Sequence, residues 1–184
     1  MIGTAWLRRR FRERARAAIR AQWRAVDEYI CDRLAPSDPA LDAALEANPK
    51  HADVARRNIA NAGLSDIVDL RVGPALDTLP PVADEGLGPF DLIFIDADKK
   101  NIPAYFDWAL RLTRRGSLII VDKVVRQGAV ANAHSDDPNI HGVRRFNELL
   151  AAEPRVSATV IQTVGSKGYD GFAIALVTAN EPAA

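Results

Sequence analysis

Cysteine, long apolar runs and net charge are what this sequence has little of. The 184 residues include one cysteine, Cys31, which excludes an intramolecular disulfide and favours a reducing compartment. No apolar stretch approaches the roughly 20 residues of a membrane-spanning helix, and arginines interrupt the N-terminal segment where a secretory signal would need an apolar run. The formal net charge of +0 gives no general attraction to nucleic acid or anionic membranes. We therefore expect a cytoplasmic protein with no membrane span and no nucleic-acid partner.

The first part of the chain carries a helical pattern with an arginine-rich face. Apolar residues recur at spacings of one, three or four up to Leu34, and arginines from Arg8 to Arg24 lie on the opposite face. That face could bind RNA, anionic lipid or a partner helix, but the simpler interpretation is a solvated surface, because acidic residues dilute its charge. We expect residues 1–20 to be a basic helical extension and residues 21–184 to form one shortened domain.

Helical and strand patterns alternate along the rest of the chain. Short apolar or β-branched runs predict strands at residues 67–72, 91–95, 118–121, 156–163 and 172–178. Helices are predicted at residues 40–47, 49–62, 76–79, 105–112 and 140–152, with a polar loop at 80–88. This alternation is typical of a parallel, doubly wound α/β sheet, in which a continuous apolar run such as 92–95 would be buried on both faces. We expect the last two strands to form an antiparallel edge.

Charged side chains follow two neighbouring strands of the predicted sheet. Asp96, Asp98 and Lys99 come directly after the strand FDLIFI, and Asp122 follows the next strand along the chain. Because consecutive parallel strands usually lie side by side, Asp96 and Asp122 should face each other over one edge of the sheet. Two convergent carboxylates suit a divalent cation such as Mg²⁺, and Lys99 could act as a general base on a hydroxyl acidified by that metal. The alternative is that each aspartate only caps the loop after its strand.

Several stretches of the chain together resemble one enzyme family. The stretches FDLIFIDADK, IIVDKVV, EANPKHADVARRN, VGPALDTLP and GYDGFAIALV resemble the cation-dependent O-methyltransferases of the caffeoyl-CoA and catechol type, and the resemblance runs from about Gln22 to Val177. It implies a Rossmann-like fold that binds S-adenosylmethionine and methylates a catechol-like or other activated hydroxyl of a small molecule. It also implies a homodimer.

The resemblance assigns catalytic roles at the predicted sheet edge. Asp96 and Asp122 would be metal ligands in that family. Asp98 would lie near the substrate, and Lys99 would be the base. The family pattern therefore names the same side chains that the strand pattern brings together.

The resemblance also assigns residues to the cofactor. Glu46 would hold the ribose hydroxyls, as a carboxylate does in dinucleotide sites. Gly73, Pro74 and Ala75 would border the adenine, where short side chains let the backbone approach a flat ring. Asp96 would lie with them at the cofactor.

The chain departs from the family first in its glycine content. There is no glycine between Gly3 and Gly63, whereas the family carries a strand and a glycine-rich turn before the ribose-binding acid. At least one βαβ unit of about 30 residues is therefore missing, and we expect a sheet truncated by the loss of its first strands and of the loop that cradles the methionine part of the cofactor. Without a strand before it, Glu46 could equally be an exposed residue of a helix.

The second departure is Lys123, because the family has asparagine after the aspartate that Asp122 matches. An ammonium at about 4 Å from a carboxylate gains roughly 4 kcal/mol at an effective dielectric constant of about 20, before desolvation. Lys123 could thus occupy the place of the metal, or it could turn to solvent and leave a weakened two-carboxylate site. Both arrangements predict weak or absent binding of Mg²⁺. The alternative function is a catalytically impaired remnant that lacks the cofactor loop and one metal ligand.

Overall fold

The computed structural model describes residues 45–165 and 168–180, together with positions 21 and 25. The basic extension predicted at residues 1–20 lies outside the described residues, as does Cys31. Part of the helix predicted at 40–47 can be compared, and there the prediction is wrong, because Leu45 and Glu46 form a short strand. Among the described residues, no helix has the length and apolar character needed to cross a membrane.

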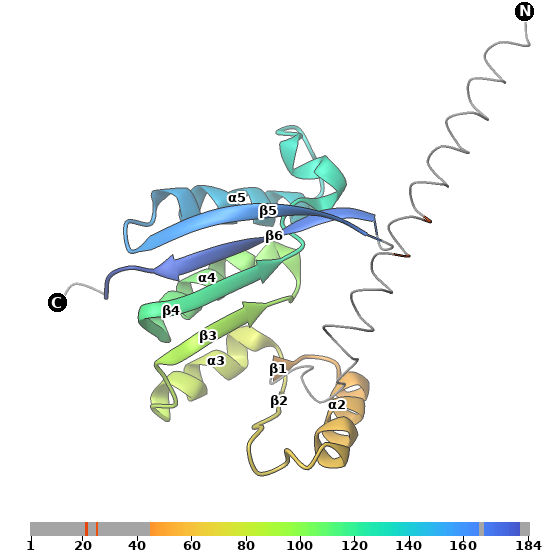
Figure 1. Cartoon of the computed structure of the whole chain (residues 1–184), viewed down its shortest axis with the longest axis vertical. Helices are drawn as coiled ribbons and strands as arrows, with labels where there is room; N and C mark the ends of the chain where they lie inside the picture. Colours follow the sequence, from red (N-terminus) through yellow and green to blue (C-terminus); the bar gives the residue numbers. More distant parts are fainter. Residues whose placement is uncertain (1–20, 22–24, 26–44, 166–167, 181–184) are drawn as a thin grey trace, which may run out of the picture.

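The part of the chain that the structure describes has two sheets, and the larger one has four strands in the order β3-β4-β6-β5 (Figure 1). The strands are β3 (Phe90–Ile95), β4 (Thr113–Asp122), β5 (Val156–Gly165) and β6 (Gly168–Val177). β3 and β4 are parallel, and β6 runs antiparallel to both of its neighbours. The predicted antiparallel edge is therefore confirmed, and β6 lies inside it, between β4 and β5.

The smaller sheet consists of two strands of two residues each. β1 (Leu45–Glu46) pairs in parallel with β2 (Arg71–Val72), so that Glu46 stands opposite Val72. A longer strand was predicted at 67–72, but the chain before β2 is turned back by hydrogen bonds from the amides of Ile67 and Val68 to the carbonyl of Leu64. These two amides are therefore not available to pair with a neighbouring strand, which a longer β-ladder would require.

In the described ranges, 45–165 and 168–180, four α-helices and two short 3₁₀ helices connect the strands. They are α2 (Pro49–Asn61), α3 (Ala75–Asp84), α4 (Ile102–Arg111), α5 (Pro138–Ala152), η2 (Lys99–Asn101) and η3 (Arg126–Ala131). The side chain of Asn48 caps α2 as the sequence predicts, by accepting a hydrogen bond from the amide of Lys50. The loop predicted at 80–88 is in part helix, because α3 continues through its two prolines while Leu79 and Val82 pack inward.

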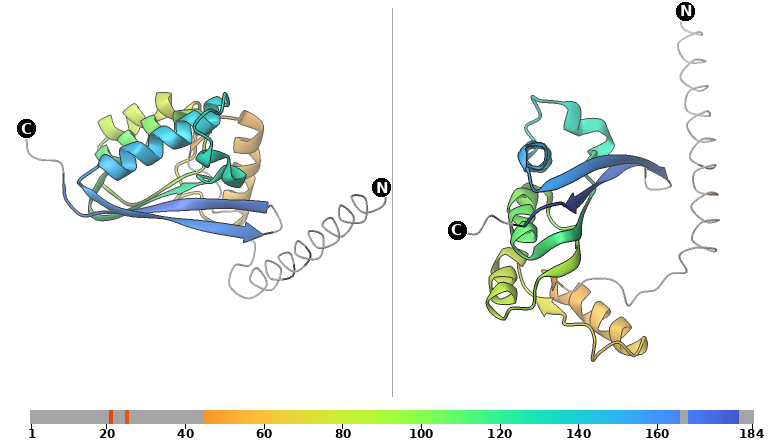
Figure 2. Two further views of the ribbon diagram at one scale, coloured as in Figure 1. Left: turned by 90° about the horizontal axis from the view of Figure 1, so that it is seen from above. Right: turned by 60° about the vertical axis from the view of Figure 1, so that its left-hand side comes forward.

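Helices α3, α4 and α5 lie on one face of the larger sheet (Figure 2). Alternate residues of the strands, such as Ile119 and Val121, point toward these helices and are buried. Phe106 of α4 and Phe146 of α5 meet edge to face, with ring centroids 5.3 Å apart, in the middle of this layer. The core therefore lies between the larger sheet and these helices.

The opposite face of the larger sheet carries exposed apolar side chains. Leu92 and Phe94 of β3 are 52% and 59% exposed, and Leu176 of β6 is 42% exposed. The prediction that residues 92–95 are buried on both faces is thus wrong for the part of the chain that the structure describes. The physical reason is that the helices described against this sheet share one face, so the alternate side chains of each strand are left uncovered.

Candidate active site

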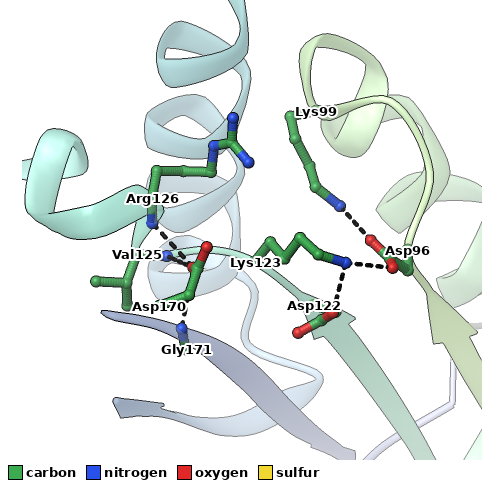
Figure 3. A network of polar contacts seen from close by, with 8 residues as sticks. All are labelled: Asp96, Lys99, Asp122, Lys123, Val125, Arg126, Asp170 and Gly171. Carbon is green, nitrogen blue, oxygen red and sulfur yellow. Dashed lines mark hydrogen bonds and ion pairs between the residues drawn. The ribbon is translucent and has the colours of Figure 1, made fainter. Parts of the chain in front are cut away.

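The predicted carboxylates converge where β3 and β4 end. The parallel register pairs Ile95 with Val121, so the next residues along the two strands, Asp96 and Asp122, lie side by side at the carboxyl edge (Figure 3). In an open α/β sheet this edge is where ligands bind. The strand pattern alone placed both residues correctly.

Two lysines contact these carboxylates. The ammonium of Lys123 bonds to Asp96 Oδ2 and, at 2.9 Å, to Asp122 Oδ2. Lys99 Nζ donates to the other oxygen of Asp96, Oδ1, at 2.8 Å. Figure 3 shows Lys123 extended between the two aspartates. Of the two arrangements that the sequence allowed for Lys123, the structure has the inward one.

The ion pairs shift the proton affinities of their partners. Burial by itself would raise the pKa of Asp96, but hydrogen bonds and charge from Lys123 and Lys99 outweigh it, so the pKa lies below its ordinary value. Burial would lower the pKa of Lys123, and its bonds to Asp96 and Asp122 outweigh that effect and raise the pKa. Both groups are therefore charged at neutral pH, and the two aspartates hold an ammonium as their counter-ion.

The backbone after β4 is held in an uncommon conformation. Lys123 has φ of 60° and Arg126 has φ of 54°, in the left-handed region that residues with a β-carbon seldom adopt. The carboxylate of Asp170 fixes this segment, because its Oδ1 accepts hydrogen bonds from the amides of Val125 at 3.1 Å and Arg126 at 2.9 Å (Figure 3). The sequence argument did not find this role for Asp170, and its only signal was an aspartate beside a glycine in the stretch GYDGF.

Lys99 is buried by a close approach of α5 to η2. Its side chain is 8% exposed, although it carries a charge. Gly142 of α5 makes the approach possible, because a β-carbon there would lie 2.2 Å from the carbonyl oxygen of Lys99. A larger residue at position 142 would therefore push α5 and Lys99 apart.

Asp98 directly precedes Lys99 and has its own partners. Its carboxylate accepts hydrogen bonds from the hydroxyl of Tyr105 and, at 2.7 Å, from the side-chain Nδ2 of Asn101. Burial and then the bond to Asp98 raise the pKa of Tyr105 to about 12. The sequence placed Tyr105 only among the apolar residues of its helix, since the turn that brings its hydroxyl to Asp98 is not visible in a helical pattern.

The predicted cofactor residues Glu46, Gly73, Pro74 and Ala75 come together at the smaller sheet, whereas Asp96 follows β3 of the larger sheet. Glu46 lies in β1, and its backbone carbonyl accepts a hydrogen bond from the amide of Gly73 at 3.1 Å. One carboxylate oxygen of Glu46 accepts from the amide of Asn48 at 2.7 Å, and the side chain is 24% exposed. The alternative of an exposed helical residue is thus wrong, because a short strand does hold Glu46.

The turn after β2 has short side chains, so a flat ring could approach its backbone closely. Gly73 has φ of 150°, and a β-carbon there would lie 3.3 Å from the Thr78 side chain, so a larger residue would be strained and crowded. Pro74 follows as the N-cap of α3, and Ala75 is its first residue. A carboxylate has more than two lone-pair sites, so Glu46 can accept ribose hydroxyls besides its bond to Asn48. These residues fit the ribose and adenine parts of S-adenosylmethionine.

Comparison with known proteins identifies the family to which this chain belongs. A family model described as O-methyltransferase matches residues 32–176. This chain belongs to the O-methyltransferase family. The match confirms the resemblance that the sequence motifs suggested.

Individual O-methyltransferases agree with the family match. Catechol O-methyltransferases from Mycobacterium tuberculosis and Niastella koreensis are 56% and 53% identical over 133 residues, or 72% of this chain. The chain covers 59% and 60% of these two relatives, so it spans about 60% of their length. A crystal structure of the O-methyltransferase from Bacillus cereus in complex with SAH matches with a TM-score of 0.78 and 42% identity, covering 86% of this chain and 99% of that one. The predicted methyltransferase fold is thereby confirmed.

A divalent cation does not fit the side chains at the edge of this O-methyltransferase sheet. Both carboxylates that could bind it, Asp96 and Asp122, are already bonded to Lys123, and Asp96 is also bonded to Lys99. Within residues 45–165 and 168–180, no group of three or more His, Cys, Asp or Glu residues could hold a metal ion. Hard cations such as Mg²⁺ take oxygen ligands, and an ammonium supplies none.

Proposed function

We propose that this chain is an S-adenosylmethionine-dependent O-methyltransferase that acts on an activated hydroxyl, such as that of a catechol, in a small molecule. The observation that carries the proposal is the convergence of Asp96, Lys99 and Asp122 at the carboxyl edge of β3 and β4, with Asp98 directly before Lys99 in the chain. The names of the relatives, two catechol O-methyltransferases and an O-methyltransferase in complex with SAH, support both the reaction and the cofactor.

The smaller sheet is the proposed cofactor site. The carboxylate of Glu46 binds the ribose hydroxyls, and the turn from Gly73 to Ala75 borders the adenine, with Asp96 facing the cofactor from β3. When bound, S-adenosylmethionine supplies an electrophilic methyl group. The pairing of β1 with β2 supports this assignment, because it holds Glu46 next to Gly73.

The η2 turn is the proposed acceptor site. Methyl transfer is an in-line displacement, which needs an ionised hydroxyl oxygen held in line with the methyl group. Lys99 rests as an ammonium paired with Asp96, so it has to release a proton to solvent before it takes the hydroxyl proton at Nζ, while Asp98 positions the acceptor. Burial of Lys99 and the bond from Tyr105 to Asp98 support these roles, since both fix the side chains before an acceptor arrives.

The second candidate is a catalytically impaired member of the family. It is favoured by one observation, the length of β1 and β2, because two residues in each strand give the cofactor residues little support. In this case the chain keeps the family fold and the charged edge without turnover. The homodimer and the cytoplasmic location stay predictions, and light scattering on the purified chain measures the first of them.

Calorimetric titration with S-adenosylmethionine, followed by transfer of a labelled methyl group to catechol, separates the two candidates. We expect saturable cofactor binding and labelled product. Lys99→Met should keep cofactor binding but lower the transfer rate by roughly 100-fold or more, since a general base contributes about 10²–10⁴. Cofactor binding without transfer to any of a panel of phenols would favour the impaired member. Failure of the folded chain to bind the cofactor would refute the proposed enzyme.

A further inference from the structure

The charged edge holds a cation that belongs to the chain itself. Lys123 reaches Asp96 and Asp122 together, and Lys99 takes the remaining oxygen of Asp96. The family that the chain resembles is cation-dependent and has asparagine at the position of Lys123. Where the resemblance implies a neutral oxygen ligand, this chain has a positive charge in contact with both aspartates.

We propose that the Lys123 ammonium is a built-in counter-ion that replaces the divalent cation, so that Asp96 and Asp122 bind no metal ion in this chain. The inference deepens the proposed function, because it describes the same edge of the sheet. It concerns binding alone, however, and can be measured without cofactor, acceptor or turnover.

The balance of charge supports the inference. Two carboxylates and two ammonium groups form the cluster, so its formal charge is already neutral. A divalent cation between the aspartates would have to displace Lys123 and would then lie near Lys99, which is buried and cannot easily move away. Repulsion between cations a few ångströms apart is strong in a partly buried site, where the effective dielectric constant is about 20.

The backbone at position 123 points to the same conclusion. With φ of 60°, this position suits asparagine, which is enriched among residues in the left-handed region, better than lysine. Lysine is nevertheless held there by two carboxylates, and its side chain is only 41% exposed. A variant with asparagine at this position should therefore keep the backbone and the fold, which makes the inference testable.

The Lys123 ammonium also has a third N–H donor besides the two that contact the aspartates. Lys123 carries three N–H bonds, and two of them meet Asp96 and Asp122. The third can donate to a ligand oxygen at the same edge, such as the hydroxyl oxygen of the proposed acceptor. A fixed ammonium in this position stabilises negative charge on that oxygen without a metal ion.

Binding of Mn²⁺, followed by electron paramagnetic resonance of the free ion and by calorimetry, tests the inference directly. The set of proteins is the wild type, Asp122→Asn, Lys123→Asn, the double variant Lys123→Asn with Asp122→Asn, and Lys100→Asn as the matched control. Lys100 is an exposed lysine next to Lys99, so the control removes one positive charge close to the cluster without opening it. Circular dichroism of each variant confirms that it is folded.

We expect no saturable Mn²⁺ site in the wild type or in Lys100→Asn. Lys123→Asn should bind Mn²⁺ at least about tenfold more tightly than the wild type, and Asp122→Asn should abolish that gain. Wild-type binding that Asp122→Asn removes would overturn the inference, as would a folded Lys123→Asn variant with no gain in affinity. Failure of methyl transfer would not affect either result, because no cofactor or acceptor is present.

Discussion

The two halves of the proposed active site differ in the size of the sheet that positions their residues. The catalytic half (residues 90–177) contains the four-stranded sheet. In it Lys99 pairs with Asp96, and Lys123 pairs with both Asp96 and Asp122, above a core of buried apolar residues. The cofactor half (residues 45–84) holds Glu46 and Gly73 by two strands of two residues each. Ile67 in this half is 77% exposed. Catalytic geometry is thus fixed by tertiary packing. In the cofactor half α3 also packs against that core, but β1 and β2, which hold Glu46 and Gly73, are joined by a few local hydrogen bonds.

The largest expected effect is on the core of the catalytic half. Phe146 is fully buried and packs edge to face on Phe106, so Phe146→Ala should lower the free energy of unfolding by about 3–5 kcal/mol. Val72→Ala in the cofactor half should cost about 0.5 kcal/mol or less, because Val72 is 40% exposed. Urea denaturation measures both. Equal losses in the free energy of unfolding for the two variants would contradict the difference in packing between the two halves.

The contact between α5 and η2 should give the next largest effect. Gly142→Ala places a methyl group 2.2 Å from the carbonyl oxygen of Lys99 and 2.6 Å from the Cα of Lys100, so backbone has to move. We expect a loss of about 1–3 kcal/mol in the free energy of unfolding. Glu148→Ala, at an exposed position of the same helix, should change it by about 0.5 kcal/mol or less. A Gly142→Ala protein as stable as the wild type would contradict the close packing at Lys99.

Glu46→Gln should lower the affinity for the cofactor without changing the stability of the cofactor-free protein. The amide keeps the bond from Asn48 but removes the charge, and hydrogen bonds to a charged group contribute about 1.5–3 kcal/mol. Affinity for S-adenosylmethionine should therefore fall by roughly 10–100-fold in calorimetric titration. The unfolding midpoint without cofactor should stay unchanged, and Glu148→Gln serves as the control for charge. Unchanged affinity would remove Glu46 from the proposed cofactor site.

The smallest expected effect concerns the bond between Tyr105 and Asp98. Tyr105→Phe should lower the free energy of unfolding by about 1 kcal/mol, because one hydrogen bond is lost while the ring stays packed. The pKa of Tyr105, raised to about 12, makes this contribution depend on pH. Since the raised pKa favours the protonated hydroxyl in the folded state, its stabilising effect is complete below pH of about 10 and is lost as pH rises through about 12.

Absorbance of tyrosinate during an alkaline titration checks this prediction. The wild type should show one tyrosine that ionises near pH 12, and Tyr105→Phe should lack it. Stability of the two proteins should converge at high pH. A Phe variant that keeps the late titration would show that another tyrosine is responsible.

The catalytic half was largely predictable from the sequence, and the cofactor half only in part: the helix capped by Asn48 is found as α2, but the strand that holds Glu46 was not expected. The runs before Asp96 and Asp122 are long enough to identify two parallel strands, and parallel pairing then brings both aspartates to one edge. The strand at Leu45 and Glu46 was missed because two residues carry no periodicity, and the stretch before them has a helical pattern. The position of Lys123 could not be decided either, since the choice between the carboxylates and solvent depends on the left-handed backbone after β4.

The exposed face of the larger sheet shows a further limit of sequence patterns. The apolar run 92–95 predicts burial on both sides, yet Leu92 and Phe94 are exposed among the described residues. Periodicity reports which side chains are apolar and not which neighbours cover them. In the same way, the pattern of α4 marked Tyr105 as apolar and left its hydroxyl bond to Asp98 unseen.

The central claim is that Lys123 stands in place of a metal ion in a family site that is otherwise recognisable. The most direct measurement is anomalous scattering from crystals of the wild type and of Lys123→Asn soaked in Mn²⁺. We predict no anomalous peak between Asp96 and Asp122 in the wild type, with Lys123 Nζ within hydrogen-bond distance of both, and a peak there in Lys123→Asn. A wild-type peak bound by both aspartates, with Lys123 turned to solvent, would contradict the account.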